Sequence, residues 1–228
     1  MHLLAERLIV DDHLTDVEVR VLGSLIEKET TTPDYYPLSL NALTNACNQS
    51  SNRDPVVQYD EGTVAHAVES LRKRSLVRAI QQSGSRVTKY RHLVNETMGT
   101  IARQNAVLGV LMLRGPQTLG ELRSRSGRLA SFESLDDVET ALNQLITREP
   151  AALVTQLPRR PGQKEARYAH LLSGEVAIDE TEVATAPAAV RGGAASDRIG
   201  ALEEGMEELR KEVADLRNQL EAFRKQFE

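Results

Sequence analysis

The chain has 228 residues, of which 40% are hydrophobic and only 4% aromatic, with no tryptophan. This composition suffices for small helical cores but argues against a large sheet or a ligand cavity lined by aromatic rings. A single cysteine, Cys47, excludes an internal disulfide and a zinc site made of several cysteines. We find no secretory signal and no stretch near the roughly 18 to 20 apolar residues of a membrane span. We therefore expect a cytoplasmic protein with no membrane partner.

The net charge of −5 is unevenly distributed along the chain. Residues 14–94 carry ten Lys or Arg against nine Asp or Glu, and residues 95–173 carry ten against eight. Residues 174–228 carry seven against thirteen. The chain up to residue 173 is therefore mildly basic and its tail is acidic, which permits nucleic-acid binding without requiring it.

Residues 1–13 show no decisive pattern, and a helix is expected to follow them. The run Thr15–Glu18 is a capping box, in which the two side chains satisfy free backbone donors at a helix start. This helix should end near Glu29, before a Thr-Thr-Thr-Pro run that is poor helix material. A second, short helix is expected from its N-cap at Ser39 to about Asn48. The apolar face of the first helix comprises Val19, Leu22, Leu25 and Ile26.

A long polar connection, Gln49–Tyr59, leads to a third helix, Glu61–Arg74. Two strands are expected next, Leu76–Ile80 and Val87–Val94, joined by a flexible tip. Three helices closed by a two-stranded ribbon form the winged-helix arrangement. The third helix has one buried stripe at helical spacing, made of Val64, Ala67, Val68 and Leu71.

Much of this order recurs about 77 residues later, which indicates one small module used twice. A helix is expected over Ile101–Leu113, followed by a capping box at Thr118–Glu121. Ser134 opens the next helix with an acidic variant of the same box. Leu153–Leu157 and Ala166–Leu172 should form the second ribbon. The clearest echo pairs Tyr90-Arg91-His92-Leu93 with Tyr168-Ala169-His170-Leu171.

We therefore expect a mainly α protein with small β wings (α+β). It would hold two tandem winged-helix domains, residues 14–95 and 96–174, and a flexible linker over 175–197. Residues 198–228 form a heptad repeat with Leu at most d positions, typical of a parallel coiled-coil dimer. The alternative is an amphipathic helix folded back on its own domain. The heptad core comprises Ile199, Leu202, Met206, Leu209, Val213, Leu216, Leu220, Phe223 and Phe227.

Long motifs in both modules carry a family resemblance. They are LTDVEVRVLGSLIEKETTTPDYYPLSLNALTNACNQSSNRDPV from Leu14, RVTKYRH from Arg86, RGPQTLGELRSR from Arg114 and PGQKEARYAHLLSGE from Pro161. These motifs resemble the YceH family of bacterial proteins over roughly Leu14 to Val176. The resemblance implies a tandem winged-helix fold but little about activity, because that family is essentially uncharacterised. The family pattern usually has a Lys where this chain has Ser50, so a phosphate contact made by that Lys in relatives would be missing here.

Winged helices often bind DNA, with the third helix in the major groove and the wing on the backbone. Cations at the end of the first module's third helix and on both wings suit phosphate contacts, whose energy is largely counterion release. The alternative is solvated surface charge, which at a helix end also complements the helix dipole. The candidate phosphate contacts are Arg72, Lys73, Arg74, Arg86, Lys89, Arg159, Arg160, Lys164 and Arg167.

The exposed faces predicted for the two third helices are not basic. The first carries His66, Glu69 and Ser70, and the second carries Glu139, Thr140, Asn143 and Gln144. This favours DNA contact led by the wings, or a protein partner, because winged helices also serve as docking modules.

The loop that follows the second helix is the most unusual motif. Its Asn, Ser and Asp side chains bond to nearby backbone and stiffen loops, and Arg53 is placed to pin the loop to a carboxylate. An ordered loop bracing two helices is one interpretation, and a binding surface is the other. The motif comprises Cys47, Asn48, Gln49, Asn52, Arg53, Asp54 and Pro55.

Catalysis and cofactors find no support in the sequence, which lacks a Gly-rich phosphate loop, a metal-spaced cluster and an acid pair. Cys47 is expected to be a buried small residue, and His92 and His170 are expected to serve the wing in both copies. The leading hypothesis is a non-enzymatic dimer that binds double-stranded DNA as a transcriptional regulator, with the coiled coil raising affinity. The runner-up is a scaffold that docks a partner protein on the same modules.

Overall fold

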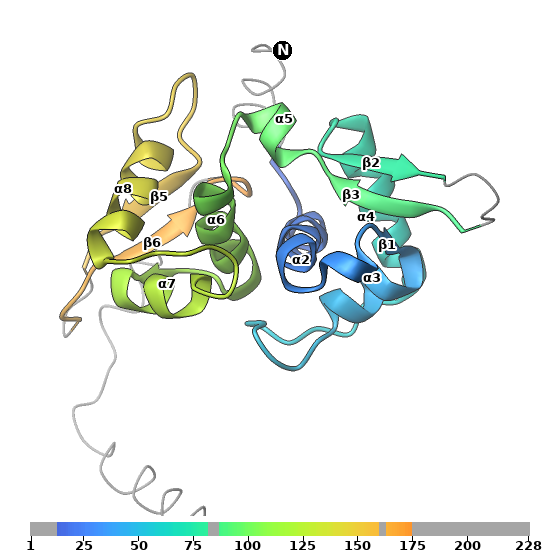
Figure 1. The fold of residues 1–228 in the computed structure, drawn as a ribbon, viewed down its shortest axis with the longest axis horizontal. Coiled ribbons are helices and arrows are strands. Elements are labelled where there is room, and N and C mark those ends of the chain that lie inside the picture. Colours follow the sequence, from blue (N-terminus) through green and yellow to red (C-terminus); the bar gives the residue numbers. More distant parts are fainter. Residues whose placement is uncertain (1–12, 82–86, 160–162, 175–228) are drawn as a thin grey trace, which may run out of the picture. The chain divides into compact units, whose positions relative to one another are not determined.

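The computed structural model describes residues 13–81, 87–159 and 163–174 (Figure 1). These ranges hold seven α-helices and two three-stranded antiparallel sheets, so the predicted α+β class is confirmed. The small sheets beside short helices are compatible with winged-helix modules. The first half contains α2 (Asp16–Thr31), η1 (Pro33–Tyr35), β1 (Leu38–Ser39), α3 (Leu40–Cys47), α4 (Glu61–Lys73), β2 (Val77–Ile80) and β3 (Lys89–His92). After α5 (Val94–Met98), the second half contains α6 (Ala102–Arg114), β4 (Gln117–Thr118), α7 (Leu119–Ser126), α8 (Leu135–Ile146), β5 (Val154–Leu157) and β6 (Arg167–His170).

The predicted helix starts are confirmed by side-chain caps at α2, α7 and α8. Glu18 N donates to Thr15 Oγ1 at 3.3 Å, while Thr15 N donates to Glu18 Oε2 at 2.7 Å. Equivalent boxes open α7 and α8. The first helix, α2, runs two residues beyond the predicted end, to Thr31. In this last turn the Thr31 hydroxyl donates back to Glu27 O at 2.9 Å.

The two predicted ribbons are confirmed as β2–β3 and β5–β6, but each sheet also has a third strand that was not predicted. The orders are β1-β3-β2 in the first half and β4-β6-β5 in the second. In the first sheet, Leu38 faces Tyr90 and Ser39 faces Lys89. The added strands are only two residues long, too short to show the alternation by which a strand is recognised in a sequence.

The predicted strand to Val94 is also too long. The ladder of β3 ends at His92, and α5 begins at Val94. His92 stabilises this change of direction, since its ring Nδ1 accepts a hydrogen bond from Val94 N at 3.3 Å. Gly99, at φ 63°, ends α5 in the left-handed region.

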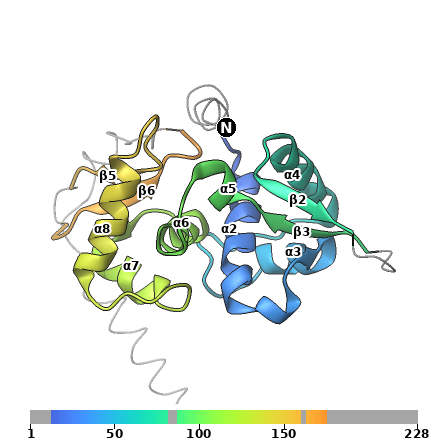
Figure 2. The same cartoon turned by 45° about the horizontal axis from the view of Figure 1, so that its top comes forward.

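The core is centred on α2 and α6, which lie side by side (Figures 1 and 2). Every residue of α2 from Glu18 to Glu27 is buried, as is every residue of α6 from Asn105 to Leu113. The sequence pattern predicts one apolar stripe on each helix, but each packs both on its own half and on the other helix. A Cβ on Gly23 would lie 3.0 Å from Met112 Cβ, and one on Gly109 would lie 3.2 Å from Ile26 Cγ2. The two glycines therefore permit the close crossing of α2 and α6.

Several predictions lie outside the described residues. They are the linker over 175–197, the coiled-coil helix over 198–228, and the wing cations Arg86 and Arg160. Within the described ranges, no helix has the length and apolar content that a membrane crossing requires.

Candidate nucleic-acid interface

The C-terminal end of α4 turns sharply into β2. Leu76 N donates to Leu71 O at 2.9 Å and Ser75 N donates to Arg72 O at 3.0 Å, the bond pattern of a Schellman motif. Ser75 takes the left-handed position of this motif, at φ 58°. From α5, the Thr97 hydroxyl donates to Ser75 O at 2.6 Å and holds the turn in place. The turn thereby sets the last residues of α4 beside the first residues of β2.

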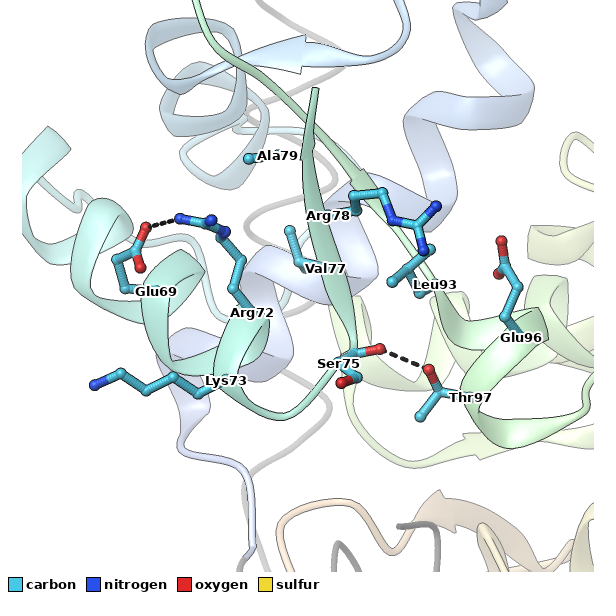
Figure 3. Close-up of a pocket in the computed structure, with 10 residues that line it drawn as sticks. All are labelled: Glu69, Arg72, Lys73, Ser75, Val77, Arg78, Ala79, Leu93, Glu96 and Thr97. Atoms are coloured by element: carbon cyan, nitrogen blue, oxygen red, sulfur yellow. Dashed lines mark hydrogen bonds and ion pairs between the residues drawn. The ribbon is translucent and has the colours of Figure 1, made fainter. Parts of the chain in front are cut away.

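A groove of about 600 Å³ opens at this turn (Figure 3). Its apolar part comes from Val77 and Leu93, which are 3% and 7% exposed. Polar and charged side chains from α4, β2 and α5 surround them. The lining residues are Glu69, Arg72, Lys73, Ser75, Val77, Arg78, Ala79, Leu93, Glu96 and Thr97.

The groove carries surplus positive charge. Arg72 forms an ion pair with Glu69 of the same helix, and Glu96 forms one with Arg91. Lys73 and Arg78 are exposed and have no ion-pair partner among the described residues. In Figure 3 these two side chains extend on either side of Ser75 and Val77. They can therefore meet two separate anionic groups.

Arg78 is a candidate that the sequence reasoning missed. It stands directly opposite Arg91 in the ladder between β2 and β3. Its exposure could have been predicted, because Arg78 directly follows the buried Val77 and successive side chains of a strand point to opposite faces.

Arg74, another predicted phosphate contact, is not among the residues that line the groove. Its side chain is 15% exposed, and its Nε lies 3.7 Å from Glu18 Oε1 on α2. Burial would raise the pKa of Glu18, but hydrogen bonds from Ser70 and Thr15 and the charge of Arg74 hold that pKa below its usual value. Arg74 thus ties α4 to α2.

The wing candidates are dispersed. Lys89 is half-buried in β3, while Arg159 and Lys164 are exposed. Arg167 donates to Pro116 O at 2.8 Å and to Glu121 Oε2 at 3.2 Å, which fastens β6 to the start of α7. A hollow of about 230 Å³ beside it is lined by Thr118, Gln163, Lys164, Glu165 and Arg167.

The motif loop is anchored by Arg53. Its Nη1 and Nη2 donate to Glu27 Oε1 and Oε2 at 3.0 and 2.6 Å, and its Nη2 also donates to Ala46 O at 2.7 Å. Both charged side chains are almost fully buried. Burial would raise the pKa of Glu27, but Arg53 and Arg128 hold it below its usual value. This is the anchoring to a carboxylate that the structural interpretation of the loop expects.

The same loop contacts the second half of the molecule. Asp54 N donates to Leu113 O at 2.9 Å, and Arg114 Nη1 donates to Asn52 Oδ1 at 3.2 Å. In return, Arg128, which follows α7, donates to Glu27 on α2. The sequence reasoning missed Arg128 because its partner lies 101 positions away. The loop therefore lies at the junction of the two halves.

Cys47 and the two equivalent histidines, His92 and His170, differ in their surroundings. Cys47 is fully buried, and burial raises its pKa to about 11. His92 Nε2 lies 2.9 Å from Glu29 Oε2. His170 Nδ1 is buried without a hydrogen-bond partner among the described residues, and burial lowers the His170 pKa to about 4. No cluster of three or more His, Cys, Asp or Glu within the described ranges could hold a metal ion.

Comparison with known proteins places the chain in a family. A family model described as "Protein of unknown function, DUF480" matches residues 14–163. A UPF0502 protein of Geotalea daltonii is 56% identical over 166 residues, which cover 73% of this chain and 75% of the relative. One from Opitutus terrae is 52% identical over 174 residues, 76% of each chain. The predicted resemblance to an uncharacterised bacterial family is confirmed, and the chain belongs to the DUF480 family, together with these UPF0502 proteins.

Proposed function

We propose that this chain is a non-enzymatic protein of two tandem winged-helix modules that binds double-stranded DNA as a transcriptional regulator. The order of elements supports the two modules: each half runs helix, short strand, two helices and two strands. We further propose that the C-terminal heptad repeat joins two chains.

The observation that carries the DNA proposal is the cationic groove at the end of α4. Lys73 and Arg78 project there without ion-pair partners among the described residues. Contact with phosphates would release the counterions that condense on DNA, which is the main source of affinity that is independent of sequence. Before its basic last turn, the exposed face of α4 carries Glu61, His66 and Glu69. The groove and wings would therefore contact the backbone, while this part of α4 would contribute little base readout.

Fluorescence anisotropy with a random duplex tests this proposal. The full chain should bind at low salt and bind far more weakly near physiological salt. The Lys73→Gln/Arg78→Gln variant should bind more weakly, and the slope of log K against log salt should fall by up to about two, because each lost phosphate contact removes about 0.9. An Arg159→Ala/Arg160→Ala/Lys164→Ala variant measures the contribution of the second wing.

A Lys73→Arg/Arg78→Lys variant is the matched control, because it keeps both charges and should retain binding. The absence of binding by the full chain even at low salt would disprove the DNA proposal. Equal duplex binding by the Gln variant and the control would show that the groove is not the DNA-binding site.

The second candidate function is docking of a partner protein, and α8 is the observation that favours it. Its exposed side chains include acids and amides but no Lys or Arg: Asp136, Glu139, Thr140, Asn143 and Gln144. Such a face repels phosphate and suits a basic protein segment. If the duplex is not bound, cross-linking pull-downs should compare the full chain with an Asp136→Lys/Glu139→Lys variant, which should lose a partner that binds this face.

A further inference from the structure

A second concentration of positive charge lies at the junction of the two halves. Glu27 is shared by Arg53 and Arg128, and Glu121 is shared by Arg125 and Arg167. Two carboxylates thus pair with four guanidinium groups, so positive charges outnumber negative ones among these six side chains.

Arg114 adds to this surplus. It donates to Asn52 of the motif loop at 3.2 Å, while its Nε is buried and has no acceptor among the described residues. Burial and the positive charges of Arg125 and Arg128 lower the pKa of Arg114, while the carboxylates of Asp54 and Glu121 offset part of that change. Like charges held together in partly buried positions oppose folding unless an anion offsets them. The junction therefore suits an anionic ligand.

The neighbouring loop adds polar groups that an oxyanion can use. Ser50 and Ser51 are exposed, and Asn52 adopts φ 59°. Hydroxyl groups and guanidinium groups are the donors that proteins commonly present to phosphate oxygens. We call Arg114, Arg125, Arg128 and the loop residues Ser50–Asn52 the junction surface.

The junction surface and the groove lie on different sides of the described structure. In Figure 1, α5 and the start of β2 lie along the upper edge, whereas α7 and the loop between α3 and α4 lie along the lower edge. Figure 2 again separates α7 from α5 and β2. A straight duplex seated in the groove would therefore not reach the junction surface.

We infer that the junction surface binds the phosphate backbone of a second nucleic-acid segment, so that one chain bridges two segments. This inference rests on the proposed function, because it assumes that the groove holds the first segment. Arg125 and Arg114 would contact phosphates, while Arg128 and Arg53 position the loop through Glu27.

A bridging assay with the full chain tests the inference. Beads that carry one duplex are loaded with protein at low salt and then offered a second, fluorescent duplex. The wild-type chain should capture the second duplex. The Arg114→Gln/Arg125→Gln variant should lose most of that capture, while its anisotropy titration with a single duplex remains within about twofold of wild type, a change of only 0.4 kcal/mol.

Arg103→Gln is the matched control, since Arg103 is an exposed arginine of α6 paired with Asp137, and it should leave capture unchanged. The single variant Arg125→Gln repeats the test if the double variant does not fold. Unchanged capture of the second duplex by the Arg125 variants would assign bridging to dimerisation and overturn the inference. A variant that loses single-duplex binding together with capture would also overturn it. A wild-type chain that binds one duplex but captures no second one also overturns it, whereas a chain that binds no duplex overturns the proposed function itself.

Discussion

The two halves of the molecule share a framework but not a surface. In each half, a leucine near the end of the third helix accepts a bond from the leucine that precedes the next strand: Leu76 N to Leu71 O, and Leu153 N to Leu145 O, both at 2.9 Å. Two residues after these accepting leucines, the first half has Lys73 and the second has Thr147. The second residue of the following strand is Arg78 in one half and Thr155 in the other.

The comparison separates the positions that each half needs for folding from the surface positions that can change without loss of the fold. The apolar stripe of α4 has buried counterparts in α8 (Val138, Ala141, Leu142 and Leu145), so both halves keep the positions that fill the core. The surface positions differ in charge, since Thr147 and Thr155 stand where the first half has Lys73 and Arg78. Duplicated modules can thus preserve the fold while one copy takes over a surface property.

The largest expected effect comes from breaking the link between the halves at Glu27. Glu27→Gln leaves Arg53 buried without a counter-charge, which should lower the free energy of unfolding by about 3 kcal/mol. Urea denaturation measures the loss. Glu69→Gln removes the exposed pair with Arg72 and should change stability by less than about 1 kcal/mol. Equal losses in the two variants would contradict the role of Glu27.

The crossing of α2 and α6 is tested by adding a methyl group. Gly23→Ala puts Cβ at 3.0 Å from Met112 Cβ, and this overpacking should lower the free energy of unfolding by about 1 to 3 kcal/mol. Gly120 on α7 meets nothing within 4 Å, so Gly120→Ala should stabilise by about 0.5 to 1 kcal/mol through helix propensity. A thermal melt of both variants gives the comparison, and a stabilising Gly23→Ala would refute the close crossing.

Protonation of His170 should make the stability of the protein depend on pH. Burial lowers the pKa of His170 to about 4, below the usual value of about 6.5 in the unfolded chain. The unfolded chain then binds the proton first, so stability should fall by up to about 2 kcal/mol between pH 7 and pH 5. Urea denaturation at both pH values should show that His170→Phe removes this part of the loss. His92→Phe should instead lower stability at both pH values, because Glu29 and Val94 N lose their partner.

The difference in charge between the two halves can be removed by introducing cations into the second half. Thr147→Lys/Thr155→Arg recreates in the second half the charges of Lys73 and Arg78. Duplex affinity at low salt should rise, and its dependence on salt should steepen by up to about two in the log–log slope. Thr147→Gln/Thr155→Gln controls for side-chain size without charge. Unchanged binding by the charged variant would mean that the groove acts through more than its cations.

The smallest effect is expected at the turn that ends α4. Ser75 lies at φ 58°, where a side chain is strained, so Ser75→Gly should stabilise by about 0.5 kcal/mol after the added entropy of the unfolded chain. Chemical denaturation can resolve this change if Ser75→Ala, which keeps a Cβ, is measured alongside. A Gly variant no more stable than the Ala variant would show that the turn is relaxed.

Local signals predicted the helices well. Each of the capping boxes that begin at Thr15, Thr118 and Ser134 spans only four consecutive residues. The apolar stripes repeat at helical spacing, so both signals can be read directly from the sequence. Strands β1 and β4 could not be found in this way, because two residues contain no period and their pairing partners are distant in sequence. Helix α5 was hidden for a similar reason, since five residues carry too little pattern.

The candidate site was only partly predictable. Exposed cations such as Lys73 are visible in the sequence, but Arg74 is equally basic and is fixed to Glu18. The distinction depends on which face of α4 meets α2, which is a property of tertiary packing. The links that join Arg128 to Glu27 and Asp54 to Leu113 also lie far apart in sequence, so no local pattern announces them.

The close packing of α2 against α6 has a practical consequence for dissecting this protein. A fragment of residues 14–95 would expose Ile26 and the surface around Gly23 to water, and Glu27 would keep only one of its two arginines. Such a fragment would present an apolar strip along one helix, a surface that promotes self-association. The contributions of the two halves should therefore be separated by point substitutions in an intact chain, because cutting between the halves would create a fragment that self-associates.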